Sequence, residues 1–475
     1  MKVICYTVTV TGVEIILRLL FNRKEAAGKT ASYDEGGKDM IWAKEETLPR
    51  AEIEAIQLER LKETVHYIYE RVEPYRRKMD DAGVQPEDIK SLNDLQKMPF
   101  TYKADFRDNY PMGLFAVDKK ELVRFHASSG TTGKPTVVGY TKNDLDMWLN
   151  NVARIACMGG ATPEDVAQIA FGYGTFTGAL GLHGGLEKLG ASVIPMSSGN
   201  TKKQIMFMQD IGTTLLVATP SYALHLGEEI RARGLDPEKD LKVHIGLFGG
   251  EGMTEPMRDE MHKVWGEGFL CTQNYGMSEL CGPGVAGECE QLCGMHINED
   301  WFIAEVINPE TGERLPSGER GELVITCLGK EALPLVRYRT GDLTRLFYEP
   351  CKCGRTTARM ENLSGRADDM LVIRGVNVFP TQIEEVLLQI PEIGPHYEIV
   401  VERKNRLDVM TISVELVDDR LLDSYGRLSE LEQRITKGLK AQLGLATRIK
   451  LVAPHSLQRF EGKAKRVTDL RKDGL

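Results

Sequence analysis

The spacing of apolar residues divides most of the chain into alternating helices and strands. Apolar side chains recur every three to four residues over 49–73 and over 143–157, which predicts two amphipathic helices. Between residues 168 and 248, short apolar runs alternate with segments of helical spacing. This pattern is typical of a parallel sheet with helices on both faces. Strands are expected there at 168–171, 192–195, 214–218 and 243–248, and helices at 179–189, 201–211 and 221–233.

From residue 366 onward, short strands alternate with two amphipathic helices, which is enough for a small α+β domain. We therefore expect an α/β protein with a large N-terminal domain over 40–365, whose mostly parallel sheets are covered by helices. A small, mobile lid domain is expected over 366–475. Residues 1–39 have the composition of a disordered linker, and we interpret them as an extension or a misassigned start. In the small domain, strands are predicted at 370–373, 398–402, 408–416 and 448–452, and helices at 380–390 and 427–443.

Composition and charge narrow the class of protein. The 475 residues include 60 Lys and Arg against 69 Asp and Glu, a net charge of −9. An acidic balance without a basic tract argues against nucleic acid or an anionic membrane as the main partner. The apolar run at 13–21 is too short, and too interrupted by charge, to span a bilayer. Nine irregularly spaced cysteines do not resemble a disulfide framework, which favours a reducing cytoplasm.

A loop rich in glycine and hydroxyl residues lies between the strand-like segments 122–125 and 137–140. Glycine lets backbone N–H groups converge on an anion, hydroxyls add donors, and a lysine adds positive charge, so the loop predicts a polyphosphate cradle. It is not a Walker A loop, because a serine stands at the position of that motif's first glycine and Pro135 replaces its Ser/Thr. The alternative is an ordinary surface loop that binds no ligand. The candidate phosphate-binding residues are Ser128, Ser129, Gly130, Thr131, Thr132, Gly133 and Lys134.

Two further loops follow strands at the edge where parallel sheets bind their ligands. In the first, glycines let the backbone approach a purine while the carboxylate of Glu251 faces its polar edges. In the second, Tyr275 offers a ring for stacking and Glu279 a hard oxygen ligand for Mg²⁺. Taken singly, these residues could equally be a helix N-terminal acid, a buried ring and a surface charge. The first loop contains Gly249, Gly250 and Glu251, and the second Asn274, Tyr275, Gly276, Met277, Ser278 and Glu279.

Two more segments offer polar or aromatic chemistry. Small residues interleave with aromatic ones over 171–178, which indicates either a packed turn or a flat apolar slot for a ring. Asp342 follows a glycine at a strand end. Its carboxylate can accept hydrogen bonds from both hydroxyls of a ribose, although a turn aspartate often binds local N–H groups instead.

Cysteines and one histidine suggest a metal site. Cys289 and His296 stand seven positions apart, and Cys351 and Cys353 follow farther along the chain. A set of three thiolates and one imidazole suits tetrahedral Zn²⁺, with Cys293 as an alternate ligand. Free buried thiols beside an ordinary histidine are the alternative.

Several of these segments, in the same order, resemble the motifs of the adenylate-forming enzymes, the acyl-CoA synthetase superfamily. The resemblance rests on Ser-Ser-Gly-Thr-Thr-Gly-Lys-Pro at 128–135, Tyr-Gly-Met-Ser-Glu at 275–279 and Tyr-Arg-Thr-Gly-Asp at 338–342. It implies that the 128–134 loop holds the β- and γ-phosphates of ATP and that Glu279 holds Mg²⁺. It further implies that Asp342 and Arg366 bind the ribose, Lys463 bridges the substrate carboxylate and the α-phosphate, and Asp368 acts as the hinge of the lid.

Within that superfamily the chain resembles the phenylacetate–CoA ligases, through Phe-Gly-Tyr-Gly-Thr-Phe at 171–176 and Pro-Cys-Lys-Cys-Gly-Arg-Thr at 350–356. The resemblance implies that an aryl acid attacks ATP to give an acyl-adenylate and pyrophosphate, after which the thiol of CoA displaces AMP. A homodimer is also implied. Phe171, Tyr173 and Phe176 are expected to line the aryl slot, and Gly184, where the family usually has a tyrosine, is expected to enlarge it.

The sequence leaves alternatives open. The acid could be phenylacetate, indoleacetate or benzoate, and the acyl group could pass to an amine or a carrier thiol instead of CoA. A protein that only binds nucleotide at a degenerate site is the third reading. The intact Glu279, Asp342 and Lys463 favour an enzyme.

Overall fold

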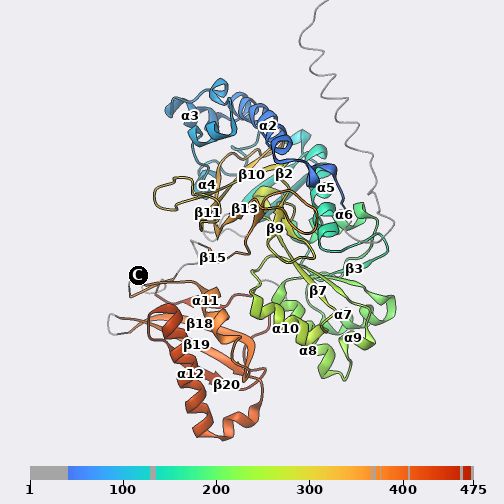
Figure 1. Cartoon of the computed structure of the whole chain (residues 1–475), viewed down its shortest axis with the longest axis vertical. Coiled ribbons are helices and arrows are strands. Elements are labelled where there is room, and N and C mark those ends of the chain that lie inside the picture. Colours follow the sequence, from blue (N-terminus) through green and yellow to red (C-terminus); the bar gives the residue numbers. More distant parts are fainter. Residues whose placement is uncertain are drawn as a thin grey trace, which may run out of the picture.

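The computed structural model describes residues 41–128, 135–363, 365–366, 371–374, 376–404, 407–460 and 464–471. The predicted phosphate-binding residues 129–134, Asp368, Lys463 and the extension 1–39 lie outside this part of the chain. The chain forms a large N-terminal unit and a small C-terminal unit, seen at the lower left of Figure 1. The predicted α/β class with a large and a small unit is confirmed.

The predicted first helix is present. A short 3₁₀ turn at Lys44–Thr47 leads into α2 (Arg50–Arg71), which buries Ile53, Leu61 and Ile68 on one face. It ends where Pro74 approaches, because proline supplies no backbone donor and is tolerated only in a helix's first turn. A second helix, α3 (Glu73–Asp81), begins there.

A nine-stranded sheet forms the centre of the large unit. Its first five strands, in the order β4, β3, β5, β6 and β7, are parallel. The alternating pattern predicts the parallel arrangement and the strands β3, β4, β5 and β6, but not β7. Beyond β7 the sheet continues with β8, β9, β14 and β13 in antiparallel pairs, which the pattern does not predict. The bounds are β4 (Ser192–Ile194), β3 (Val166–Ile169), β5 (Leu215–Ala218), β6 (Ile245–Phe248), β7 (Leu270–Tyr275), β8 (Ala286–Glu288), β9 (Met295–Ile297), β14 (Arg359–Met360) and β13 (Leu346–Phe347).

Helices cover both faces of the parallel half. Leu215 and Val217 of β5 belong to the buried cluster that includes α5 and α6, whereas Leu216 and Ala218 belong to the cluster on α8 and α10. This alternation follows from the period of two along a strand. The helices are α5 (Lys142–Met158), α6 (Thr177–Leu189), α7 (Thr201–Phe207) with a π-helical continuation at Met208–Gly212, α8 (Pro220–Ala232), α9 (Pro237–Asp240) and α10 (Glu255–Trp265).

Two antiparallel sheets complete the large unit. β1 (Arg124–Ser128) and β2 (Thr136–Tyr140) pair on either side of the predicted phosphate loop. The second sheet has the order β10 (Phe302–Ile307), β11 (Gly321–Cys327), β12 (Tyr338–Thr344) and β15 (Gly365–Arg366). In it Asp342 lies opposite Arg366, so the backbone of these two predicted ribose-binding residues is adjacent.

The small unit has its own core. Its four strands have the order β20 (Arg448–Val452), β19 (Leu407–Leu416), β18 (Ile393–Lys404) and β21 (Val467–Asp469). The helices α11 (Pro380–Leu387) and α12 (Tyr425–Leu443) pack against the sheet through Ile383, Ile435 and Leu439, and β16 (Leu371–Ile373) and β17 (Val376–Val378) form a hairpin. Among all the described residues, no helix combines the length and the apolar character that a membrane span needs.

Candidate active site at the carboxyl ends of the central strands

The two ends of the predicted phosphate loop are held in register. Ser128, the last residue of β1, pairs with Thr136, the first residue of β2. The hydroxyl of Ser128 is buried and has no hydrogen-bond partner among the described residues. A buried hydroxyl without a partner is costly, so this donor is suited to an anion held by the loop.

The loop after β6 has the close backbone packing that its glycines predict. A Cβ at Gly249 would lie 2.7 Å from Oδ1 of Asn274, whose Nδ2 donates to the carbonyl of Phe248 at 2.8 Å. Gly250 has φ +79°, a left-handed conformation that favours glycine, and a Cβ there would meet the ring of Phe171 at 3.2 Å. This loop therefore lies against the first residue of the predicted aryl slot.

The structure gives Glu251 partners from both units. Its Oε2 accepts hydrogen bonds from the hydroxyl and the backbone N–H of Ser221, at the start of α8. Its Oε1 accepts a hydrogen bond from the backbone N–H of Ala464 in the small unit. The predicted purine-facing acid thus also joins the two units, through Ala464, the residue that follows Lys463 in the sequence.

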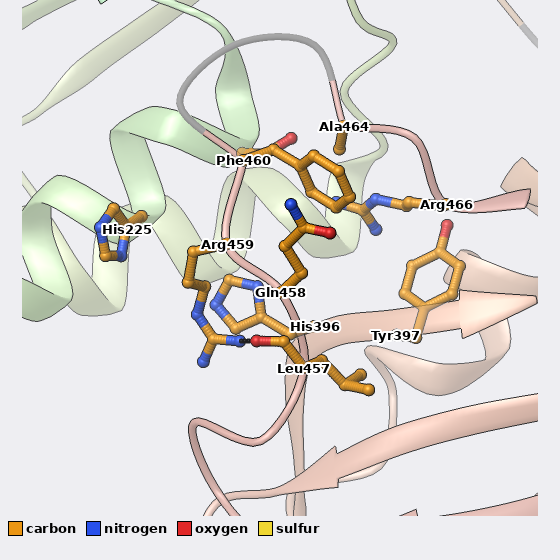
Figure 2. A pocket seen from close by; sticks show the side chains of 10 residues that line it. His225, His396, Tyr397, Leu457, Gln458, Arg459, Phe460, Ala464 and Arg466 are labelled. Carbon is orange, nitrogen blue, oxygen red and sulfur yellow. Dashed lines mark hydrogen bonds between the residues drawn. The ribbon is translucent and has the colours of Figure 1, made fainter. Parts of the chain in front are cut away.

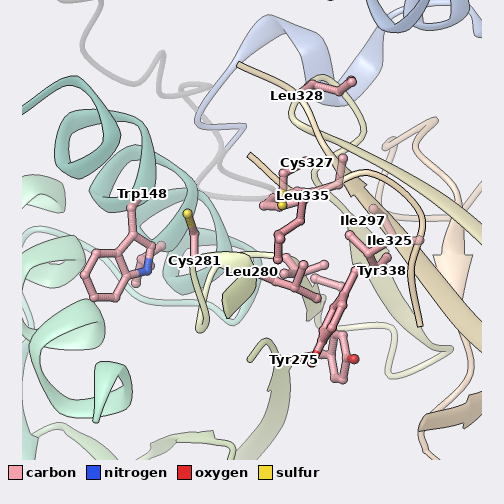
Figure 3. Close-up of a cluster of buried hydrophobic side chains, with 14 of the residues drawn as sticks. Trp148, Tyr275, Leu280, Cys281, Ile297, Ile325, Cys327, Leu328, Leu335 and Tyr338 are labelled. Atoms are coloured by element: carbon pink, nitrogen blue, oxygen red, sulfur yellow. The ribbon is translucent and has the colours of Figure 1, made fainter. Parts of the chain in front are cut away.

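Two predicted nucleotide-binding residues contact each other. The hydroxyl of Tyr275, at the end of β7, donates to Oδ2 of Asp342 on β12 at 2.6 Å, and both residues are buried. Figure 3 shows Tyr275 next to Tyr338 at one end of a buried apolar cluster that also contains Leu280. The phenol therefore fixes the orientation of the carboxylate that is predicted to bind the ribose.

Glu279 lies in a tight turn. A Cβ at Gly276 would lie 2.4 Å from Cα of Gly282, so two backbone segments pass each other at a distance that only glycine allows. Glu279 itself is buried, and its backbone carbonyl accepts a hydrogen bond from Nζ of Lys330 at 3.0 Å. A buried carboxylate is a hard oxygen donor of the kind Mg²⁺ prefers, so this residue fits the predicted ion.

The predicted aryl-slot residues differ in their surroundings. Phe171 packs on the loop after β6, whereas Phe176 is 51% exposed. The hydroxyl of Tyr173 lies 2.8 Å from Nδ1 of His183, whose Nε2 lies 3.0 Å from Oε1 of Glu187. Burial raises the pKa of Tyr173 to about 12, so its hydroxyl stays protonated at neutral pH.

Gly184 has a packing role that the sequence did not predict. It lies on α6 facing α5, where a Cβ would meet the side chain of Leu149 at 2.7 Å. Neighbouring Gly181 and Gly185 face Trp148 and Val152 of α5 in the same way. A larger side chain at position 184 would displace Leu149 first, and the enlargement of an aryl slot by Gly184 stays a prediction.

The predicted metal ligands come together. One ligand atom from each of Cys289, His296, Cys351 and Cys353 lies within 4.8 Å of the others, and all four residues are buried. Nε2 of His296 lies 3.4 Å from Sγ of Cys353, while its Nδ1 lies 3.1 Å from Oγ1 of Thr357. A hydrogen bond at Nδ1 leaves Nε2 available as a ligand, which is a common arrangement around zinc. The donor set therefore fits a closed, structural Zn²⁺ site.

Contacts between the two units lie beside the candidate site. His396 of β18 lies 3.2 Å from both carboxylate oxygens of Glu228 on α8. Oγ1 of Thr254 donates to Glu384 of α11 at 3.3 Å. A small cavity at this junction is shown in Figure 2, with His225 on the α8 side and His396, Arg459, Phe460 and Arg466 on the side of the small unit.

Lys330 and Tyr140 are site-adjacent residues that sequence reasoning missed. Lys330 binds the backbone of Glu279, and the hydroxyl of Tyr140 binds the backbone of Ser278 at 3.2 Å. Neither lies in a recognisable motif, and the partners are 51 and 138 residues away along the chain. A lone lysine or tyrosine in sequence predicts only a solvated charge or a core ring.

Fold and site together define a two-unit adenylate-forming enzyme, and comparisons with known proteins agree. The family profile of AMP-binding enzymes matches residues 41–327, and that of the AMP-binding enzyme C-terminal domain matches residues 375–471. A phenylacetate-coenzyme A ligase of Thermus thermophilus is 51% identical over 90% of this chain and 98% of its own length. One of Escherichia coli is 47% identical over 90% of this chain and 97% of its own. The chain belongs to the AMP-binding enzymes and, within them, to the phenylacetate–coenzyme A ligase family.

A solved relative indicates which arrangement of the two units is present. The structure of 2-hydroxyisobutyryl-CoA ligase in its postadenylation state with 2-HIB-AMP has a TM-score of 0.86 at 29% identity, covering 93% of this chain and 94% of that one. The same ligase in its thioesterification state, with 2-HIB-AMP and CoA, has a TM-score of 0.67 at 30% identity, covering 93% and 95%. The present arrangement is therefore closer to the postadenylation state.

Proposed function

We propose that the protein joins phenylacetate to coenzyme A at the expense of ATP, through phenylacetyl-adenylate, with release of pyrophosphate and AMP. The observation that carries this proposal is the buried Tyr275–Asp342 contact beside Glu279 at the strand edge, in a chain of the phenylacetate–coenzyme A ligase family. A carboxylate needs no general base to attack the α-phosphate, so the protein's task is to position it and to neutralise charge.

Several of the predicted residues have a part in the adenylation step. Residues 128–134 hold the β- and γ-phosphates, and Asp342, oriented by Tyr275, holds the ribose together with Arg366. Lys463 bridges the attacking carboxylate and the α-phosphate oxygens. Glu279 would hold Mg²⁺, which neutralises phosphate charge when bound. The Glu251–Ala464 contact supports this role of Lys463, because it ties the adjacent residue to the large unit.

The thioester step requires the small unit to turn about Asp368, because a lysine at the α-phosphate leaves no room for the pantetheine thiol. The similarity to a ligase solved in both the postadenylation and the thioesterification state supports such a rotation. CoA then displaces AMP from the adenylate.

The acid is proposed to lie against Phe171, Tyr173 and Phe176. Phe171 packs on the nucleotide-side loop at Gly250, which favours a pocket that continues from the α-phosphate. Each well-placed aromatic contact adds about 0.5–1.5 kcal/mol for a ring substrate. The hydroxyl of Tyr173, held by His183, gives the slot one polar position.

We further propose a structural Zn²⁺ held by Cys289, His296, Cys351 and Cys353. The loop at 351–357, which carries Cys351 and Cys353, is tied to the N-terminal segment. Nε of Arg355 in this loop forms an ion pair with the buried carboxylate of Glu46 at 2.6 Å. The ion would thus hold together the strand β9, the loop at 351–357 and the entry segment at 44–47. We also propose that the protein is a cytoplasmic homodimer that acts in the catabolism of phenylacetate, with neither a nucleic acid nor a membrane as partner. The net charge of −9 supports the absence of a nucleic-acid or anionic-membrane partner.

Acid-dependent exchange of pyrophosphate into ATP tests the proposal. A panel of phenylacetate, indoleacetate and benzoate, with CoA then added, should give the fastest exchange and a thioester with phenylacetate. Exchange without a thioester would favour a different acyl acceptor. No exchange with any acid would favour a protein that only binds nucleotide.

A further inference from the structure

Three buried aromatic side chains, His126, Tyr140 and Trp148, lie behind the loops of the candidate active site. Each is at most 2% exposed, and we refer to them as the aromatic cluster. The rings of Tyr140 and Trp148 stack with centroids 4.8 Å apart, and His126 meets both edge-on at 5.6 Å. His126 comes from β1 and Tyr140 from β2, the strands that flank the predicted phosphate loop, and Trp148 comes from α5. Close packing on this scale gives the polar atoms of the rings fixed positions.

His126 binds the backbone of the segment 171–178, which contains the predicted aryl-slot residues. Its Nδ1 lies 3.0 Å from the carbonyl oxygen of Thr175 and 3.1 Å from that of Phe176. Both partners are acceptors, so Nδ1 carries the proton. Burial lowers the pKa of His126, which keeps the ring neutral in this tautomer.

Tyr140 and Trp148 hold the loop that carries Glu279. The hydroxyl of Tyr140 donates to the carbonyl of Ser278 at 3.2 Å. The indole N–H of Trp148 donates to the carbonyl of Pro283 at 2.6 Å. The aromatic cluster therefore binds the backbone of this loop on both sides of Glu279.

Lys330 adds a third hydrogen bond to the backbone of the same loop. It is 1% exposed, its ammonium lies 4.8 Å from the ring centroid of Tyr140, and it donates to the carbonyl of Glu279 at 3.0 Å. The consecutive carbonyls of Ser278 and Glu279 are thus each bound by a buried donor. Two bound carbonyls fix the peptide units on either side of the Glu279 Cα, and with them the direction in which its side chain leaves the backbone.

We infer that Tyr140 and Lys330 are positioning residues that aim the Glu279 carboxylate for the metal-bound form of ATP. The inference rests on the proposed function, in which Glu279 would hold Mg²⁺. Neither residue is expected to contact the nucleotide, since both act through the backbone of the loop. Its rival is that the cluster and Lys330 only stabilise the core, in which case changing them would lower stability without a specific effect on metal-dependent binding.

Tyr140→Phe tests the inference with the smallest change, because it removes the hydroxyl and keeps the stacked ring. Lys330→Met removes the ammonium and keeps the length of the side chain. The matched control is Tyr75→Phe, which removes a buried hydroxyl that lies 2.7 Å from Oγ1 of Thr101, outside the site. For each full-length protein, calorimetry gives the Kd of ATP with Mg²⁺ and with EDTA, and kinetics give kcat and KM for phenylacetate.

In Tyr140→Phe we expect the Kd of ATP to rise about tenfold with Mg²⁺ and less than about twofold with EDTA. The kcat of Tyr140→Phe should fall, while its KM for phenylacetate stays near that of the unaltered protein. For Tyr75→Phe, the Kd of ATP, kcat and KM should all stay near those of the unaltered protein. Lys330→Met should likewise weaken ATP binding with Mg²⁺ more than with EDTA. If Lys330→Met does not fold, the result for Tyr140→Phe alone tests the inference.

Equal changes in Kd with and without Mg²⁺ would overturn the inference, as would a lower Tm with an unchanged Kd. These outcomes would leave the proposed function standing. Failure of the unaltered protein to bind ATP even with Mg²⁺ would refute the proposed function and the inference together.

Discussion

The hydroxyl of Tyr275 donates a 2.6 Å hydrogen bond to the carboxylate of Asp342, although the two residues lie 67 positions apart in the chain. A hydrogen bond to a charged group contributes more than one between neutral groups, because the carboxylate is the stronger acceptor. The pair joins the end of β7 to β12, so the nucleotide site depends on the packing of two sheets.

Tyr275→Phe should therefore weaken ATP binding. Loss of one hydrogen bond to a carboxylate costs about 1.5–3 kcal/mol, and we expect at least a roughly tenfold higher KM for ATP. The KM for the acid should stay the same. Steady-state kinetics with each substrate varied in turn check this.

Tyr69→Phe is the matched control, because it removes a hydrogen bond of 2.9 Å to Asp80 on the outer helices. An unchanged KM for ATP in Tyr275→Phe, or an equal rise in the control, would contradict the role of the pair.

Lys463→Ala should affect one half-reaction only. If Lys463 neutralises charge in the adenylation transition state, its loss should slow pyrophosphate exchange by about 10²-fold or more. Conversion of supplied phenylacetyl-adenylate to the thioester should continue at nearly the original rate. Lys465→Ala, which removes an exposed lysine two positions away, serves as the control. Equal losses in both half-reactions would rule out this assignment.

Removal of the proposed zinc should be measurable without an activity assay. Protein purified without a metal-affinity tag should hold close to one zinc per chain by elemental analysis, and Cys353→Ser should lose the metal and lower the Tm. Cys293→Ser should keep the metal, because Cys293 is exposed, although its sulfur lies 3.5 Å from that of Cys351. Zinc-free unaltered protein, or loss of zinc in Cys293→Ser alone, would require a different site.

The Glu228–His396 contact should stabilise the present arrangement of the two units. Burial raises the pKa of Glu228, but the hydrogen bond to His396 and the nearby charges of Arg459 and His225 outweigh it, so the pKa lies below its usual value. Because the bound carboxylate has the lower pKa, its contribution is fully present above its usual pKa and is lost only as the pH falls through the lowered value.

Glu228→Gln should therefore slow pyrophosphate exchange several-fold, by about 1 kcal/mol, at neutral pH while leaving thioester formation from supplied adenylate intact. Glu229→Gln on the same helix is the control. Slowing of both half-reactions to the same degree would show that the contact does not favour one arrangement.

The periodicity of apolar residues predicted five helices of the large unit (α2, α5, α6, α7 and α8) and four of its five parallel strands, because both patterns repeat over a whole element. It did not predict the parallel strand β7 or the helix α10. The predicted strand at 168–171 is β3 at Val166–Ile169. The backbone N–H of Ala170 still donates to the carbonyl of Val217 on β5 at 2.8 Å, and the chain departs from the strand at Phe171. The strands β8, β9, β13 and β14 are two or three residues long, too short to show a period, and they form through pairing with distant segments.

The candidate site, too, was predictable where the signal is local and not where it depends on distant contacts. Local motifs identified Tyr275, Glu279 and Asp342 one by one, since each motif is a contiguous run. The contact between Tyr275 and Asp342 could not be predicted from these motifs, because it depends on how two sheets pack. The support of Glu279 by Lys330 had no local signal for the same reason.

A single-turnover reaction with excess enzyme tests the central proposal most directly. Phenylacetate and ATP with Mg²⁺, but without CoA, are mixed with the protein, and the products are identified by mass spectrometry before and after CoA is added. We expect phenylacetyl-adenylate and pyrophosphate first, and then phenylacetyl-CoA and AMP. Formation of ADP and phosphate, or the absence of any adenylate with phenylacetate, would contradict it.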